Sequence, residues 1–267
     1  MTSALDGHWA LILGASSGFG AATAKALAKD GLNIVGVHLD RKGTLPLVEQ
    51  VIRDIQATGR KAVFINANAA DAAKRADVIA AIGQELASSN PRRSVKVLLH
   101  SLAFGALRPY VAGDGDEITV DQMNMTLDVM ANSLVYWAHD LVKAGLMGEG
   151  GRIFAMTSSG GTRVWPHYGA VSAAKAALES HIRQLALELA PHKITANAIR
   201  AGVTDTPALR KIPGNEQMME FSKARNPYKR LTTPEDVAQA IAVLSDPRTH
   251  WLTGNTIGVD GGEDIVG

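Results

Sequence analysis

The sequence predicts an α/β fold in which a doubly wound sheet of seven parallel strands carries helices on both faces. Two observations lead to this prediction. Seven short apolar runs rich in β-branched residues recur along the chain, and amphipathic helical stretches separate most of them. Alternating strands and helices require right-handed crossover connections, which make neighbouring strands parallel and cover both faces of the sheet.

The predicted strands are short, as expected for strands buried on both faces. They comprise residues 9–13, 33–38, 62–65, 95–100, 152–156, 194–199 and 256–259. Helical stretches are predicted at residues 21–29, 45–58, 72–88 and 168–189, and Pro191 ends the last of them. In that last stretch, apolar residues three and four apart form one stripe expected to face the core: Val171, Ala174, Leu178, Ile182, Leu185 and Leu189.

Composition narrows the function to small-molecule chemistry. The 267 residues show no linker-like stretch, so we expect one domain over residues 1–267. The 27 basic and 26 acidic residues argue against a nucleic-acid or membrane surface spread over the protein. The absence of cysteine excludes thiol catalysis and disulfides, and the eight histidines lack metal-ligand spacing, so no metal site is expected.

The N-terminal region shows no targeting pattern. It carries no early basic residue, and its apolar run is too short for a signal peptide. No other run approaches the length that spans a membrane. Together with the lack of cysteine, these features predict a soluble, cytoplasmic protein.

A glycine-rich turn joins the first predicted strand to the first helical stretch. Gly14 permits a tight turn, Gly18 lets the backbone approach a pyrophosphate, and Gly20 allows the helix to pack on the strand. The helix N-terminus supplies N–H groups to the anion. An ordinary glycine-rich loop is the alternative, but the flanking strand and helix favour a Rossmann-like dinucleotide site. The residues predicted to bind the cofactor here are Gly14, Ser16, Ser17, Gly18, Phe19 and Gly20.

Tyr168 and Lys175 lie seven residues apart, which is nearly two helical turns, so both face one side of the predicted helix. An ammonium near a phenol is expected to lower the phenol's pKa, and it can also hold a sugar hydroxyl. Tyr136 and Lys143 repeat the spacing inside another helical stretch. Tyr168 is favoured as a proton donor because it follows a strand at the edge where doubly wound sheets bind ligands, although a structural role stays open.

These features together resemble the short-chain dehydrogenase/reductase superfamily over nearly the whole chain. The glycine turn and the C-terminal Val259-Asp260-Gly261-Gly262 are typical of the superfamily in general. Tyrosine and lysine separated by six residues look like its enoyl-acyl-carrier-protein reductase branch, as do residues 100–103, His-Ser-Leu-Ala. Alcohol-oxidising members have lysine four positions after the tyrosine, where this chain has Ser172. The chain is therefore a mosaic of the two types.

The resemblance implies site residues and an assembly. Tyr168 would hydrogen-bond and help to protonate an enolate, while Lys175 would bind the ribose. Ser158 stands where many enoyl reductases carry a second tyrosine, and it would partly replace that residue. A homotetramer is implied. Further cofactor residues are expected to be Asn68, Ala69, Ser101, Leu102, Ala103, Thr157, Gly202, Thr204 and Thr206, and the substrate residues Phe104, Tyr168, Met218 and Phe221.

The choice between NADH and NADPH depends on the second predicted strand. Asp40 follows Gly20 by the interval at which an acidic residue accepts the ribose hydroxyls of NAD. His38 occupies the position where the superfamily usually has its aspartate, and Arg41 with Lys42 could meet a 2′-phosphate. We predict NADH, with NADPH as the alternative.

The segment at about residues 205–231 is expected to be irregular and to cover the substrate. Met218, Met219 and Phe221 could line an acyl channel there, or they could belong to a helix that packs on the core. The segment also carries a basic excess that could dock an acidic acyl carrier protein, although solvated surface charge is the commoner explanation. Its basic residues are Arg210, Lys211, Lys223, Arg225, Lys229 and Arg230.

The sequence therefore predicts an enoyl-[acyl-carrier-protein] reductase. It would use NADH to reduce the trans-2 double bond of enoyl thioesters, on acyl carrier protein or CoA, in type II fatty acid synthesis. A general carbonyl, 3-ketoacyl or hydroxysteroid reductase of the superfamily is the alternative enzyme. A non-catalytic NAD(P)-sensing protein is the second alternative, but such proteins lose the proton donor that this chain retains.

Overall fold

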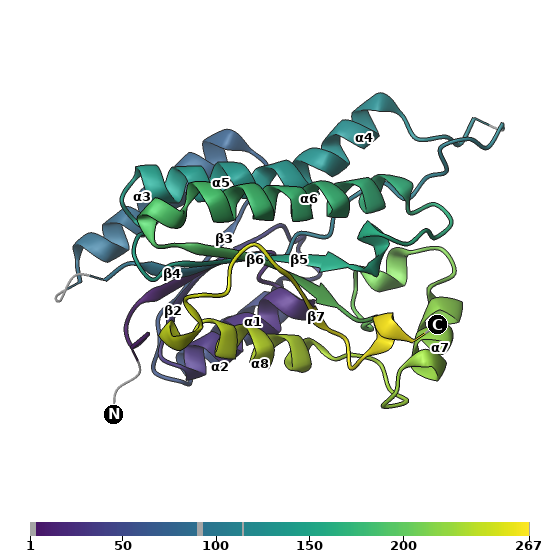
Figure 1. Cartoon of the computed structure of the whole chain (residues 1–267). Helices are drawn as coiled ribbons and strands as arrows, with labels where there is room; N and C mark the ends of the chain where they lie inside the picture. The colour runs from purple at the N-terminus through teal and green to yellow at the C-terminus, as the bar shows by residue number, and fades with distance from the viewer. Residues whose placement is uncertain (1–3, 90–92, 114, 267) are drawn as a thin grey trace.

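A parallel seven-stranded sheet with the strand order β3-β2-β1-β4-β5-β6-β7 runs through the centre of the molecule (Figure 1). The structure, a computed structural model, describes residues 4–89, 93–113 and 115–266. The predicted doubly wound α/β fold is confirmed. The strands are β1 (Trp9–Leu13), β2 (Asn33–His38), β3 (Ala62–Asn66), β4 (Val95–His100), β5 (Arg152–Ser158), β6 (Thr195–Ala201) and β7 (Thr256–Val259).

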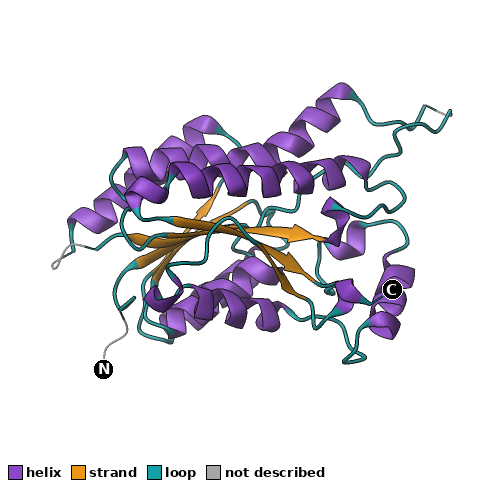
Figure 2. Ribbon diagram, viewed as in Figure 1, coloured by secondary structure: helices purple, strands orange, loops and turns teal. Residues whose placement is uncertain are grey.

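Helices cover both faces of this sheet (Figure 2). The helices α1 (Gly18–Lys29), α2 (Leu45–Gln56) and α8 (Pro234–Leu244) pack on one face. On the other face lie α3 (Ala72–Ala87), α4 (Val120–Leu127), α5 (Ser133–Lys143) and α6 (Gly169–Glu188). A five-residue π-helix, Asp128–Asn132, connects α4 to α5 and packs against α6.

The core consists of two apolar layers, one on each side of the sheet. Successive side chains of a strand point to opposite faces, so Leu98 joins the α3–α6 layer while Leu99 joins the α1–α8 layer. The apolar stripe predicted for α6 is buried along its whole length, from Val171 to Leu189. Burial on both faces explains why a central strand such as β1 is a continuous apolar run rather than an alternating one.

The strands β5 and β6 extend two residues beyond their predicted ends. Thr157 and Ser158 pair with Arg200 and Ala201 across the two strands. Backbone hydrogen bonds continue the ladder here although the side chains of Thr157 and Ser158 are polar, which is why the apolar run ended earlier. The consequence is that Ser158 is held at the carboxyl end of a strand rather than in a loop.

The segment at residues 205–231 is more regular than predicted. It contains a 3₁₀ turn, Leu209–Lys211, and the helix α7 (Asn215–Arg225). Among the residues of α7, Ser222 is the one that is fully buried, so the helix lacks the apolar stripe by which a surface helix is recognised. In Figure 1 α7 stands beyond the end of the sheet, beside the C-terminus.

Candidate active site

A cavity of about 430 Å³ opens at the carboxyl edge of the sheet. Its wall is formed by the loop after β4, the loop and helix start after β5, the segment after β6, and α7. Ligands of doubly wound sheets bind at this edge, beside the strand where the order reverses. The predicted site residues in the wall are Phe19, Ser101, Leu102, Ala103, Phe104, Thr157, Ser158, Tyr168, Lys175, Gly202, Thr204, Thr206, Met218 and Phe221.

The remaining predicted cofactor residues lie outside this cavity wall. They follow β1, β2 and β3 at the same carboxyl edge of the sheet. A ligand as long as a dinucleotide would need both regions. The residues are Gly14, Ser16, Ser17, Gly18, Gly20, Asp40, Asn68 and Ala69.

The glycine turn is packed so tightly that side chains do not fit. Gly14 has a φ of +88°, and Gly18 has a φ of +51°. A Cβ atom at Gly20 would overlap the carbonyl oxygen of Gly14. A Cβ atom at Gly18 would stand 3.4 Å from the methyl group of Thr206. The turn therefore lies directly beside the segment that follows β6.

The N-terminus of α1 is not capped by a side chain. Ser17 is the N-cap residue in extended conformation, and its hydroxyl makes no capping hydrogen bond. The first N–H groups of a helix have no partner within the helix. They attract anions, because the helix dipole adds to their donor character. This arrangement fits a pyrophosphate.

Asp40 lies just beyond β2 with its backbone fixed by Asn66. The Asp40 N–H donates to the Asn66 side-chain oxygen at 3.1 Å, and the Asn66 amide donates to the Asp40 carbonyl at 2.9 Å. His38 Nδ1 is 3.0 Å from the Asp40 carboxylate. Burial acts to raise the pKa of Asp40, but hydrogen bonds from Thr44, Ser16 and His38 bring it below its usual value. A fixed carboxylate thus stands beside the glycine turn.

Lys175 is fully buried on α6, with 6% of its surface exposed. Its ammonium donates to the Met156 carbonyl of β5 at 2.7 Å. Burial lowers the pKa of Lys175 to about 8, while the Glu179 carboxylate acts in the opposite direction. The lysine is therefore held at the end of β5 in the wall of the cavity.

Tyr168 is the N-cap residue of α6, directly at the end of the loop that follows β5. Its ring lies against Gly160, where a Cβ atom would come within 2.6 Å of the ring edge. Burial raises the pKa of the Tyr168 phenol, and a hydrogen bond with Ser158 acts in the opposite direction. Tyr168, Ser158 and Lys175 thus belong to one wall of one cavity.

The expected effect of the lysine on the phenol is wrong for this structure. The shift of the Tyr168 pKa is upward because of burial, the hydrogen bond with Ser158 opposes it, and Lys175 is not among its causes. The ammonium faces the Met156 carbonyl instead. A phenol kept protonated in an apolar wall can still donate a proton, because donation requires the neutral form.

Glu179 was not predicted from the sequence, yet its carboxylate stabilises the charged form of Lys175. The Thr157 hydroxyl donates to the Glu179 carboxylate at 2.7 Å. Lys175 and Glu179 lie one helical turn apart, and they reach the consecutive strand residues Met156 and Thr157. These two contacts fix α6 on the end of β5. A polar residue four positions after a buried lysine was the available signal.

His100 ends β4 in a fully buried position. Ser133 donates its hydroxyl proton to the Val129 carbonyl at 2.9 Å, so His100 Nε2 must donate to the Ser133 oxygen, also at 2.9 Å. Burial and, to a smaller extent, the nearby Lys175 charge lower the pKa of His100 to about 3. The imidazole is neutral and joins β4 to the π-helix.

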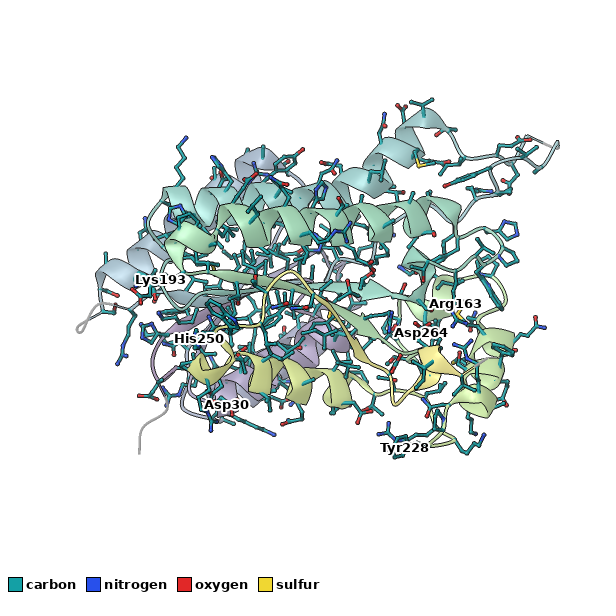
Figure 3. The ribbon with its side chains drawn as sticks, viewed as in Figure 1. Asp30, Arg163, Lys193, Tyr228, His250 and Asp264 are labelled. Carbon is teal, nitrogen blue, oxygen red and sulfur yellow. The ribbon has the colours of Figure 1, made fainter. Side chains whose placement is uncertain are left out.

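Two further contacts close the loop at residues 159–168 over the cavity. The Trp165 indole N–H donates to the Pro213 carbonyl at 3.1 Å. Arg163 donates to the Asp264 carbonyl at 2.7 Å, and its Nε is 3.1 Å from the Asp264 carboxylate. Figure 3 shows the side chains of Arg163 and Asp264 close together near the C-terminal turn. The loop is therefore tied to the segment before α7 and to the C-terminus.

The basic excess of the segment at residues 205–231 is partly neutralised. Arg210 pairs with Asp205 through two hydrogen bonds, and Arg230 pairs with Asp236 in the same way. Lys211 lies in the cavity wall. The patch available for an acidic partner is thus smaller than the sequence suggested.

In the part of the chain that the structure describes, no His, Cys, Asp or Glu side chains gather as a metal site would require. Across the same residues, every helix is too short or too polar to cross a membrane.

A family model described as "Enoyl-(Acyl carrier protein) reductase" matches residues 14–263. The 1-cyclohexenylcarbonyl-CoA reductase of Streptomyces collinus is 29% identical over 258 residues, which cover 96% of this chain and 86% of that relative.

Two solved structures extend the similarity to the fold. The enoyl-[acyl-carrier-protein] reductase (NADH) of Aquifex aeolicus superposes with a TM-score of 0.84 and 26% identity, covering 98% of each chain. A short-chain dehydrogenase of Burkholderia cenocepacia in complex with NADP gives a TM-score of 0.82 and 28% identity, covering 97% of this chain and 99% of that one. The match to the family model covers most of the sequence, and it confirms the resemblance noted from the motifs. The chain therefore belongs to the enoyl-(acyl carrier protein) reductase family, within the short-chain dehydrogenase/reductase superfamily of oxidoreductases.

Proposed function

We propose that this protein reduces the trans-2 double bond of an enoyl thioester with NADH. The observation that carries the proposal is the placement of one half-buried phenol, Tyr168, two helical turns before the buried ammonium of Lys175 in the wall of one cavity. The relatives named above include reductases of enoyl thioesters on acyl carrier protein and CoA. An acyl carrier protein is our preferred carrier.

The residues present fit a nicotinamide dinucleotide. The pyrophosphate would lie on the glycine turn and the uncapped N-terminus of α1. Thr206, which adjoins Gly18, would hold the carboxamide end. Asp40 would accept the ribose hydroxyls, and its carboxylate would repel a 2′-phosphate, which favours NADH over NADPH.

The chemistry needs one hydride and one proton. When bound, the nicotinamide would supply the hydride that the β-carbon of the enoyl group accepts. Negative charge then collects on the thioester oxygen, where Tyr168 donates a hydrogen bond and helps to deliver the proton that the α-carbon finally receives. Ser158, hydrogen-bonded with Tyr168, orients the phenol. Lys175 holds the ribose and keeps a positive charge behind the site.

The spacing of the pair suits a double bond better than a ketone. In a ketone the carbon that accepts hydride bears the oxygen, whereas in an enoyl thioester the oxygen is two carbons away. Three extra helical residues between Tyr168 and Lys175 move the phenol by roughly 4.5 Å along the axis. The proton donor would therefore stand farther from the nicotinamide, in keeping with the two carbons that separate the hydride acceptor from the oxygen.

The acyl chain would lie between α7 and the loop after β4. Met218 and Phe221 of α7 and Phe104 of the loop line the cavity, and Phe104 and Phe221 are about 60% exposed without a ligand. Exposed aromatic side chains at a cavity mouth gain from covering by an apolar chain. Lys211 and Lys223 are the basic residues we propose for carrier docking. The homotetramer stays a prediction.

The test compares three substrates in the same NADH-oxidation assay. Crotonyl thioester should be reduced at least about 100-fold faster, in kcat/KM, than a 3-ketoacyl thioester or a steroid ketone. In parallel assays, the KM for NADPH should be higher than the KM for NADH. If the ketones react well and crotonyl thioester does not, the proposal is wrong. If none reacts although NADH binds, the protein is an NAD(P)-sensing protein.

A general carbonyl reductase is the second candidate. The contact between Ser158 and Tyr168 places two hydroxyl groups together, which could polarise one carbonyl oxygen. The superfamily-type glycine turn favours the same function. The ketone arms of the assay decide between the two.

A further inference from the structure

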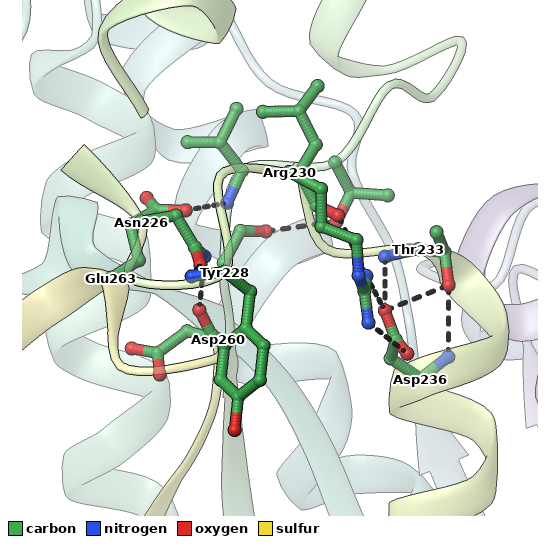
Figure 4. Close-up of polar contacts among 11 residues, drawn as sticks. Asn226, Tyr228, Arg230, Thr233, Asp236, Asp260 and Glu263 are labelled. Atoms are coloured by element: carbon green, nitrogen blue, oxygen red, sulfur yellow. Dashed lines mark hydrogen bonds and ion pairs between the residues drawn. The ribbon is translucent and has the colours of Figure 1, made fainter. Parts of the chain in front are cut away.

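The buried carboxylate of Glu263 joins the two sides of the cavity. Glu263 starts the 3₁₀ turn Glu263–Ile265 after β7, and 4% of its surface is exposed. Its Oε2 accepts the Val203 backbone N–H at 3.2 Å (Figure 4). Val203 lies between Gly202 and Thr204, which are proposed cofactor residues. Glu263 therefore fixes the segment that would carry the nicotinamide.

The same carboxylate also holds α7. Ser222 of α7 is 4% exposed and hydrogen-bonds to Glu263. Arg225 of α7 faces the carboxylate electrostatically, and its guanidinium lies 5.5 Å from the ring centre of Phe221. Burial raises the pKa of Glu263, while Val203, Ser222 and Arg225 stabilise its charged form. A buried carboxylate is costly unless such partners surround it.

The end of α7 is fastened to the same turn by a second buried group. Asn226, with 2% of its surface exposed, donates from its side-chain amide to the Asp260 carbonyl at 2.8 Å (Figure 4). Its oxygen accepts the Tyr228 N–H at 2.8 Å. Gly261 has a φ of +60° and lies against this amide, where a Cβ atom would come within 3.3 Å. The C-terminal turn thus anchors both the middle and the end of α7.

We propose that Glu263 is a positioning residue that couples coenzyme binding to closure of α7 over the substrate. Val203, Ser222, Arg225 and Glu263 all line the cavity, so the link runs along its wall. A coenzyme bound to the Gly202–Thr206 segment would act on Val203 and, through the carboxylate that Val203 shares with Ser222 and Arg225, on α7. This inference rests on the proposed function for the location of the nicotinamide, but not for the identity of the substrate.

The test uses tryptic cleavage of α7 with and without NADH, because the segment carries Lys223, Arg225 and Lys229 as cleavage sites. In the wild type, saturating NADH should slow cleavage there about tenfold. In Glu263→Gln, the amide cannot balance Arg225, and NADH should slow cleavage less than twofold although fluorescence shows that it still binds. In Ser222→Ala, a milder change, NADH should slow cleavage by an intermediate factor. Ile265→Ala is the matched control, since Ile265 lies on the same turn but is 85% exposed.

Steady-state kinetics supply a second readout. Glu263→Gln should raise KM for crotonyl thioester about tenfold with a smaller change in kcat, because α7 is loosened while the phenol stays in place. If NADH slowed tryptic cleavage equally in Glu263→Gln and in the wild type, the coupling would be overturned. It would also be overturned if NADH did not slow cleavage of α7 in the wild type. Failure of the wild type to bind either NADH or NADPH would overturn the proposed function and the coupling together.

Discussion

The chain contains two tyrosine–lysine pairs with identical spacing on two helices that cover the same face of the sheet. Tyr136 and Lys143 lie on α5, and Tyr168 and Lys175 on α6. Tyr136 is 42% exposed, with the Arg75 guanidinium 5.4 Å from its ring centre, and Lys143 is exposed. In the α6 pair, burial raises the pKa of the phenol and lowers that of the ammonium.

The difference shows that position on the sheet, rather than spacing, sets the chemistry. The α6 pair begins directly after β5, so the carboxyl edge of the sheet and the cavity receive both side chains. The α5 pair lies within a helix whose polar side faces α3, where Arg75 also pairs with Asp140 at 2.7 Å. The side chains of the α5 pair are exposed to solvent, whereas burial in the cavity wall shifts the pKa values of both side chains of the α6 pair.

The largest expected effect comes from removing each phenol oxygen in turn. Tyr168→Phe should lower kcat for crotonyl thioester by about 100-fold or more, because the proton donor is lost. Tyr136→Phe should leave kcat within about twofold of the wild type. Steady-state assays of both variants check this. Similar activity in the two variants would remove the distinction between the pairs.

Replacing Lys175, but not Lys143, should change activity and stability in opposite directions. Lys175→Met should lower activity about 100-fold yet raise the free energy of unfolding at pH 7, because the buried charge is removed. The pKa of Lys175 falls from 10.5 to about 8 on folding, which corresponds to a cost of roughly 3 kcal/mol. Lys143→Met should change both quantities little. Denaturant titrations and kinetics measure the two effects.

The pH dependence of the free energy of unfolding tests independently whether burying the charge of Lys175 destabilises the fold. Because the folded pKa of Lys175 is lower than the unfolded one, the unfolded chain binds more protons between about pH 8 and 10.5. The free-energy cost of burying the charged ammonium is fully present below pH 8, and it is relieved as the pH rises through this window. Wild type should therefore gain stability relative to Lys175→Met between pH 8 and 10.5, and a constant difference would contradict the burial of the charge.

The negative charge of Glu179 provides a further test of the buried Lys175 ammonium. Activity should fall as the pH rises through about 8, where Lys175 loses its proton. Glu179→Gln removes a negative charge that supports the ammonium, so this falling limb should move about half a unit to lower pH. Glu188→Gln, an exposed change on the same helix, is the control and should leave the profile unchanged. A purely structural role for Glu179 would lower kcat without moving the limb.

The smallest expected effect concerns the α5 pair. Arg75→Ala removes the contact with the Tyr136 ring and the ion pair with Asp140. The free energy of unfolding should fall by about 1 kcal/mol, with kcat unchanged. Thermal or denaturant unfolding measures this, and a loss of activity would show that α5 contributes more to the site than its exposure suggests.

Much of the fold was predictable because its signals are local. The apolar runs placed all seven strands, and the glycine turn was located because Gly14 and Gly20 leave no space for a Cβ atom. Tyr168 was preferred over Tyr136 by its place after a strand. The helix α7 was missed because it buries little apolar surface, and its buried anchor at Ser222 is polar.

The contacts that complete the candidate site had no local signal. Glu179 pairs with Thr157 across 22 residues, Trp165 with Pro213 across 48, and Glu263 with Val203 across 60. No short pattern marks such partners, because each pair forms only when separate strands and loops meet at the sheet edge.

The sequence by itself determined the seven strands, the helices α1, α2, α3 and α6, the turn that can receive a pyrophosphate, and the helix that starts after Tyr168 and carries Lys175. These follow from backbone preferences and from the period of apolar residues, which act over a few positions. Only the tertiary structure decided which of the two tyrosine–lysine pairs lies in the cavity wall, which way the phenol's pKa moves, and what holds α7. Those properties depend on desolvation and on the charges that long-range packing brings within a few ångströms.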